Sequence, residues 1–196
     1  MTQRFVRMTN RLIAAGLTAT VMIGAPAPAL AATQWTVVDE DSRLGFEATQ
    51  QGGEFEGRFE SFDADLRFSA DDLPGSRFDV RIRTGSVETG SSQRDSALPG
   101  EDWFNVDAFP EATYVADEIT STAEGYEAAG TLTIRENTHP VTLPFTWETD
   151  GNRAFMDGSV VIDRTRFGVG QGDWSDPSVS DHEVRVVVDL TLSKAQ

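Results

Sequence analysis

The residues of this chain that could perform chemistry are few and isolated. Its two histidines, His139 and His182, each fall in a turn before a strand-like segment. The chain has no cysteine, which excludes a thiolate nucleophile, a disulfide framework and a cysteine-based metal site. No G-x-S-x-G segment is present, and no serine has an evident base partner. We therefore interpret both histidines as turn or surface residues and expect a protein that is not an enzyme.

Two other patterns have the composition of a ligand site without its context. The acidic pairs Asp39/Asp41, Asp63/Asp65 and Asp71-Asp72 lack the D-x-D-x-D-G loop and distal Glu of a calcium site. The glycine-rich segment 168–172 is followed by Asp173 and Trp174, not by a helix whose N-terminus would hold a pyrophosphate. We expect solvated acidic turns, with neither a metal nor a nucleotide bound.

Two arginine–aspartate pairs leave two interpretations open. Arg94-Asp95 lies in segment 91–110, where no strand periodicity is found. It is either an ion pair that holds a loop or a contact to a ligand head group near the opening of a cavity. Asp163-Arg164 has the same ambiguity, because it stands at the end of a predicted strand.

Charge and composition exclude several classes of protein. The chain has 196 residues, with 16 Lys+Arg against 32 Asp+Glu and a net charge of −16. This acidity argues against nucleic-acid binding and against a polybasic contact with anionic lipid. Hydrophobic residues make up 39% of the chain, enough for a core in one domain.

Residues 1–31 have the order of a Sec-type signal peptide. Arg4, Arg7 and Arg11 precede the uncharged run 12–23, and Ala29-Leu30-Ala31 forms a small-x-small cleavage site. The run is too short to span a bilayer, so we expect no stable membrane insertion. The signal predicts a periplasmic protein whose folded domain covers residues 32–196, with 13 Lys+Arg against 32 Asp+Glu.

The remaining chain has the two-residue periodicity of β-strands. Segments 77–87, 126–134, 141–147 and 184–192 each carry one apolar and one polar face. Short turns between them indicate antiparallel neighbours. Segment 91–110 breaks the pattern, and we expect one or two short helices there, through Leu98 and over 101–109. About eight such strands form either a sandwich or a closed barrel.

The chain resembles the YceI-like family, the periplasmic polyisoprenoid-binding proteins with a lipocalin-like barrel, over nearly all of residues 35–192. The motifs that carry the resemblance, in the family's order, are Trp35 with 42–46, 57–62, 86–98, 102–110, 130–135, 140–143 and 163–168. Two departures stand out. Gln50 to Gly53 replace a loop that often carries a histidine, and Glu136 stands where many members have glycine.

The resemblance implies an all-β, about eight-stranded antiparallel lipocalin-like barrel. Its cargo would be an isoprenoid lipid or a quinone, with no other cofactor and no metal. The residues we expect to contact that cargo are Phe46, Phe59, Phe62, Phe78, Arg94, Asp95, Trp103, Phe104, Leu132, Phe145, Trp147, Arg164 and Phe167. Alternatives are an interaction module for a membrane cytochrome b partner, without cargo, and an enzyme acting on a lipid or quinone. The oligomeric state is left open.

Overall fold

The computed structural model describes residues 31–195, so residues 1–30 of the expected signal peptide lie outside it. The described part contains eleven strands, one short α-helix and several 3-10 turns. The strands are β1 (Thr33–Val37), β2 (Arg43–Gln50), β3 (Gly53–Phe59), β4 (Phe62–Phe68), β5 (Arg77–Arg83), β6 (Val87–Glu88), β7 (Glu111–Ser121), β8 (Tyr126–Ile134), β9 (Asn137–Asp150), β10 (Arg153–Asp163) and β11 (Glu183–Lys194). The helix is α1 (Ser92–Ala97).

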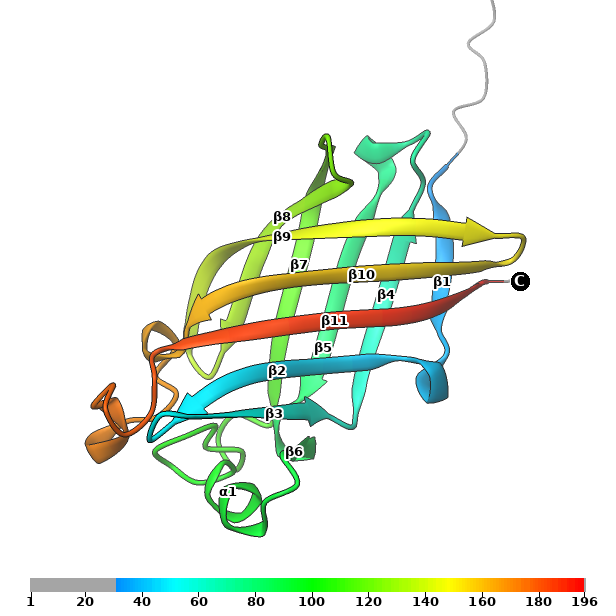
Figure 1. Ribbon diagram of the computed structural model, residues 1–196. Helices are drawn as coiled ribbons and strands as arrows, with labels where there is room; N and C mark the ends of the chain where they lie inside the picture. Colours follow the sequence, from blue (N-terminus) through cyan, green and yellow to red (C-terminus); the bar gives the residue numbers. More distant parts are fainter. Residues whose placement is uncertain (1–30, 196) are drawn as a thin grey trace, which may run out of the picture.

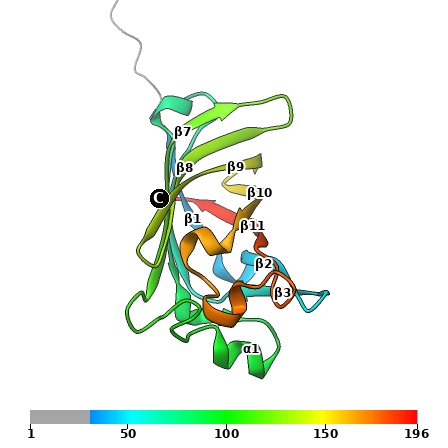
Figure 2. The same ribbon diagram turned by 90° about the vertical axis from the view of Figure 1, so that its left-hand side faces the viewer.

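Eight of these strands form a closed antiparallel barrel, which confirms the predicted fold. They are hydrogen-bonded in the order β1-β4-β5-β7-β8-β9-β10-β11, and the pairing of β1 with β11 closes the ring. In Figure 1, β9, β10 and β11 run across β4, β5 and β7, so the barrel is flattened into two walls whose strands cross. Figure 2 shows the two walls from the side.

Strands β2, β3 and β6 extend one wall beyond the closed ring. The first half of β11 pairs with β2, from Arg185 to Asp189, while its last residues pair with β1. β3 continues the sheet from β2, and β6 pairs with β3. This extension lies on the same side of the molecule as α1 (Figure 1). It therefore lengthens the barrel wall toward α1.

The alternation predicted from the sequence agrees with the burial of the strands. In β5, Phe78 is buried and its neighbour Arg77 is exposed. In β8, Ala128 and Leu132 are buried, whereas Glu127 and Thr131 are exposed. Apolar side chains thus line the inside of the barrel, and charged side chains cover its outside.

Segment 91–110 contains one of the two expected helices. Helix α1 begins at Ser92 and ends at Ala97, close to the prediction. The second expected helix, over 101–109, is absent from this described segment, which forms successive turns. Two of its backbone hydrogen bonds differ from the i→i−4 pattern of an α-helix: Phe104 N–H donates to the Leu98 carbonyl, and Asn105 N–H donates to the Gly100 carbonyl. Asn105 also has a φ of 49°, which interrupts a right-handed helix.

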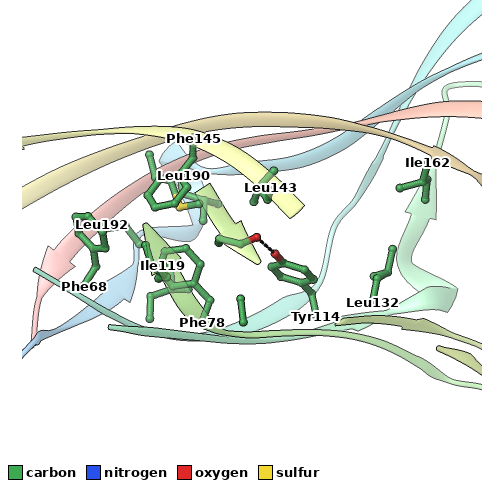
Figure 3. Close-up of a cluster of buried hydrophobic side chains, with 14 of the residues drawn as sticks. Phe68, Phe78, Tyr114, Ile119, Leu132, Leu143, Phe145, Ile162, Leu190 and Leu192 are labelled. Atoms are coloured by element: carbon green, nitrogen blue, oxygen red, sulfur yellow. Dashed lines mark hydrogen bonds between the residues drawn. The ribbon is translucent and has the colours of Figure 1, made fainter. Parts of the chain in front are cut away.

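The end of the barrel away from α1 is filled by aromatic rings. Phe68 lies 4.5 Å from Trp147, 4.9 Å from Tyr126 and 5.7 Å from Phe145, measured between ring centroids. Trp35 joins this group through Trp147, at 5.4 Å. Figure 3 shows Phe68, Phe78 and Phe145 gathered at one side of the view with aliphatic side chains, while Leu132 and Ile162 lie apart from them. We call Trp35, Phe68, Tyr126, Phe145 and Trp147 the aromatic plug.

Candidate ligand cavity

The half of the barrel nearest α1 contains two adjoining cavities. The mouth cavity, of about 190 Å³, lies between α1, the loop that follows it, the later part of β2 and the start of β11. The deep cavity, of about 120 Å³, lies inside the barrel. Phe59, Phe104, Ile134, Ile162 and Val186 line both cavities, so a single set of side chains separates them.

Most of the residues predicted to contact a ligand line one of these cavities. Phe46, Phe59, Arg94, Trp103, Phe104 and Arg164 line the mouth cavity. Phe59, Phe62, Phe78, Phe104 and Leu132 line the deep cavity. Asp95, Phe145, Trp147 and Phe167 line neither. Phe145 and Trp147 belong to the aromatic plug, and Phe167 packs edge-on against His139 at 5.1 Å.

Phe46 is held at the mouth cavity by a glycine on the neighbouring strand. Gly57 of β3 pairs with Phe46 of β2, and a Cβ at Gly57 would lie only 2.3 Å from the Phe46 ring. The ring therefore lies over a bare backbone. This close approach explains the glycine in segment 57–62 better than backbone flexibility does.

Arg94 and Asp95 bind the same threonine instead of each other. The Asp95 carboxylate accepts hydrogen bonds from the backbone N–H and the hydroxyl of Thr89, at 2.9 and 2.7 Å. The Arg94 guanidinium donates to the Thr89 hydroxyl and carbonyl, at 3.1 and 3.3 Å, and lies 4.2 Å from the centre of the Phe55 ring. Arg94 thus places a cation, stacked on an aromatic ring, in the wall of the mouth cavity.

Trp103 lines the mouth cavity and has an unused hydrogen-bond donor. Its indole Nε1 is buried and bonds to no atom of the described residues. Its ring packs against Trp174, with centroids 5.4 Å apart. A buried N–H without an acceptor costs free energy.

Arg164 holds the loops around the mouth together. It is only 4% exposed, and its guanidinium donates to five backbone carbonyl oxygens. These belong to Asp181 (2.8 Å), Val169 (2.7 Å), Gly170 (3.1 Å), Trp174 (2.6 Å) and Ser180 (2.7 Å). Burial lowers the pKa of Arg164, while the nearby carboxylates of Asp163 and Asp181 oppose that shift. All these partners lie in loops, so the guanidinium acts as a tie between them.

The glycine-rich segment 168–172 curves around this arginine. Gly170 has a φ of +78°, and a Cβ there would lie 2.0 Å from an Arg164 guanidinium nitrogen. Gly168 and Gly172 also have positive φ values. The glycines let the chain turn around a buried charge, which gives this motif a structural role.

Arg135 ties the β8–β9 turn to the same loops, a role that the sequence analysis missed. Its guanidinium donates to the carbonyls of Glu101 and Trp103, both at 3.1 Å, and of Gly168 at 2.6 Å. Its φ is 56°, a conformation that favours glycine. The left-handed residue is therefore Arg135, next to the Glu136 at which the sequence departs from the family.

The two histidines lie outside the cavity walls. His139 Nε2 is 2.9 Å from the Arg166 carbonyl oxygen, and His182 Nε2 is 2.8 Å from that of Ser175.

Tyr114, which lines the deep cavity, donates its hydroxyl hydrogen to the Ala128 carbonyl at 2.7 Å, and burial raises its pKa to about 12. Between residues 31 and 195, no group of three or more His, Asp or Glu side chains is placed to hold a metal ion.

Several cavity residues could not be singled out from the sequence. Phe55 and Trp174 line the mouth cavity, as do Val184 and Val186 of β11. The alternating valines of segment 184–192 predict the apolar face of a strand. That signal does not separate a cavity wall from a packed core, because both are apolar.

Comparisons with known proteins agree with this architecture. The chain is 36% identical over 96 residues to a UPF0312 protein of Yersinia enterocolitica, and it spans about half the length of the curated relatives it matches. The structure is similar to BcnA of Burkholderia cenocepacia, with a TM-score of 0.75 and 30% identity over 79% of this chain and 98% of BcnA.

A second structural neighbour has a much more distant sequence. It is a polyisoprenoid-binding domain from Saccharophagus degradans, with a TM-score of 0.64 and 14% identity over 83% of this chain and 99% of that domain. The model of the YceI-like domain matches residues 35–192. The mouth loops, both cavities and all but the outermost residues of the barrel therefore fall within this match, and the chain belongs to the YceI-like family.

Proposed function

We propose that this protein binds an isoprenoid amphiphile, such as a quinone or a polyprenyl lipid, and carries it through the periplasm. The tail would occupy the deep cavity, and the head would lie in the mouth cavity. The observation that supports this most directly is the contrast between the two cavities. The deep one is lined almost wholly by apolar side chains, and the mouth contains Arg94 and Trp103.

Burial of the tail would supply most of the affinity. Apolar surface removed from water contributes about 25 cal/mol per Å². Phe62, Phe78, Leu132 and Val186 offer the tail a wall without charges. A tail held in this way needs no specific polar contact, so binding would depend on shape and length.

The mouth would recognise oxygen atoms on the head group. Arg94 provides a cation, and the Trp103 indole provides a free N–H. Quinone carbonyls and phosphate oxygens both accept hydrogen bonds from such donors. Arg164 would not contact the head directly, because its donors are occupied by five carbonyl oxygens.

We test this proposal by titrating the purified, lipid-free protein with a short-tailed ubiquinone and with farnesol. Tryptophan fluorescence would report binding, because Trp103 and Trp174 line the mouth cavity. We expect both ligands to bind with a stoichiometry of one. If neither ligand binds, the proposal is contradicted and the cargo-free module is favoured.

A matched pair of variants locates the binding site. Ala64 lines the deep cavity, so Ala64→Phe should fill it and weaken farnesol binding at least tenfold. Thr131 is exposed on the outer face of β8, so Thr131→Phe should bind like the wild type. Undiminished binding by a folded Ala64→Phe variant would show that the tail lies elsewhere.

A further inference from the structure

The deep cavity ends against the aromatic plug. Phe78 is 1% exposed and lines the cavity. Its ring also contacts the plug, with its centroid 5.3 Å from that of Phe145 and 6.4 Å from that of Phe68. Phe78 therefore stands at the boundary between the hollow and the filled parts of the barrel.

Beyond Phe78 the plug leaves no continuation of the cavity. None of its five residues lines either cavity. Tyr126 stacks on Phe145 at 5.5 Å, and Phe68 packs on Trp147 at 4.5 Å. The Trp35 indole N–H donates to the Phe68 carbonyl at 3.1 Å, and this hydrogen bond fixes the Trp35 ring in place. Rings packed and hydrogen-bonded in this way do not make room for a ligand without cost.

The opposite end of the deep cavity adjoins the mouth cavity. Phe59 and Phe104 line both cavities, and their ring centroids lie 5.7 Å apart. A tail would enter from the mouth between these side chains and advance toward Phe78. The path therefore has an entrance at the mouth and a stop at Phe78.

We infer that the tunnel is blind and that Phe78 sets the greatest tail length that it holds. This inference rests on the proposed function and adds a substrate class to it: amphiphiles whose isoprenoid tail ends at the plug. A longer tail would leave its remaining units in the mouth cavity or in water. Those units would add little affinity, because they bury little further apolar surface.

A series of isoprenoid alcohols with increasing numbers of units tests this length limit. All share one head group, and displacement of a single fluorescent isoprenoid compares them on one scale. We expect affinity to rise at least tenfold per unit while units enter the cavity, and then less than twofold for each unit added. An affinity that rises evenly through the longest tail would overturn the inference.

Variants of Phe78 connect the limit to this residue. Phe78→Ala removes a ring about the size of one isoprene unit, so the break in the series should move by roughly one unit to longer tails. Phe78→Leu is a smaller change that preserves more packing, and it should move the break in the same direction. Leu192→Ala is the control, because Leu192 is fully buried and lines neither cavity; its break should stay where the wild type has it.

The outcomes separate the length limit from the proposed function. If no isoprenoid binds to the wild type, the proposed function fails. If isoprenoids bind but the break is absent, or stays in place in both folded Phe78 variants, then the length limit at Phe78 is wrong and the carrier proposal stands.

Discussion

Arg164 is a buried cation whose hydrogen-bond partners are backbone carbonyls. A guanidinium offers five N–H donors in a fixed plane, whereas an ammonium offers three. We therefore expect Arg164→Lys to destabilise the protein by about 3 kcal/mol, since several buried carbonyls lose their partner. Urea unfolding measures this change. Arg166→Lys, at an exposed neighbour, should stay within about 0.5 kcal/mol of the wild type; equal losses in both variants would contradict the role given to Arg164.

Asp157 is a carboxylate in unfavourable surroundings on the outer face. It lies directly opposite Asp189 in the β10–β11 register. Loss of solvation, followed by the charges of Asp189 and Glu148, raises the pKa of Asp157 above its ordinary value. The folded state therefore favours the protonated form. Its ionisation lowers stability above the folded pKa, and this loss is relieved as the pH falls through that pKa.

Replacing Asp157 by Asn should consequently raise stability near pH 7. We expect a gain of about 0.5 kcal/mol, because like charges opposite each other in a sheet are mildly unfavourable. Melting curves at several pH values should show the gain disappear under acidic conditions, where the wild-type carboxyl is protonated in both states. Glu127→Gln, on exposed β8, serves as control. A gain that persists at low pH would exclude charge repulsion as its cause.

The β8–β9 turn shows how one element supports the mouth. Arg135 keeps a left-handed conformation that glycine would adopt without strain, yet its guanidinium binds three loop carbonyls. We expect Arg135→Gly to relieve the strain while loosening the loops. Hydrogen exchange should accelerate in residues 99–106 and 168–174 and stay unchanged in the barrel strands. Glu136→Gly should leave both loops protected; unchanged loop exchange in Arg135→Gly would contradict this account.

The strands were predictable from the sequence, and the cavity was not. The alternation of polar and apolar residues predicted β8 over 126–134, because each strand has one polar face and one apolar face. The same alternation placed both Phe78 and Phe145 on apolar faces and did not distinguish them as ligand contacts. Whether a buried ring borders a cavity or fills a plug depends on contacts between distant strands, which a single sequence does not encode locally. Arg164 was ambiguous and Arg135 was missed for a related reason, since the partners of both are backbone carbonyls of loops.

The whole molecule carries a large negative charge. The chain has a net charge of −16, and its surface ion pairs, such as Arg43–Glu56 and Arg153–Asp41, are about half exposed. Exposed pairs of this kind contribute little stability. Repulsion between the excess carboxylates should therefore lower stability when salt is scarce.

No helix among residues 31–195 is long and apolar enough to cross a membrane.

A salt series tests this repulsion together with the chemistry of the cargo. The melting temperature should rise as monovalent salt increases from about 0.01 M to a few tenths molar, because screening shortens the repulsion to about 10 Å near 0.1 M. Affinity for farnesol should change little, since burial of an uncharged tail is not a Coulomb process. A flat melting temperature would contradict the repulsion. A steep loss of affinity for the natural cargo with salt would indicate an anionic head group held by Arg94.

The most direct test of the carrier account is native mass spectrometry of the full chain, expressed with its own N-terminal segment and purified gently from a Gram-negative periplasm. The account predicts a protein–ligand complex whose extra mass, after release, is that of an isoprenoid amphiphile, and loss of that mass in the Ala64→Phe variant. A wild-type protein that is recovered folded and without any bound lipid would contradict it.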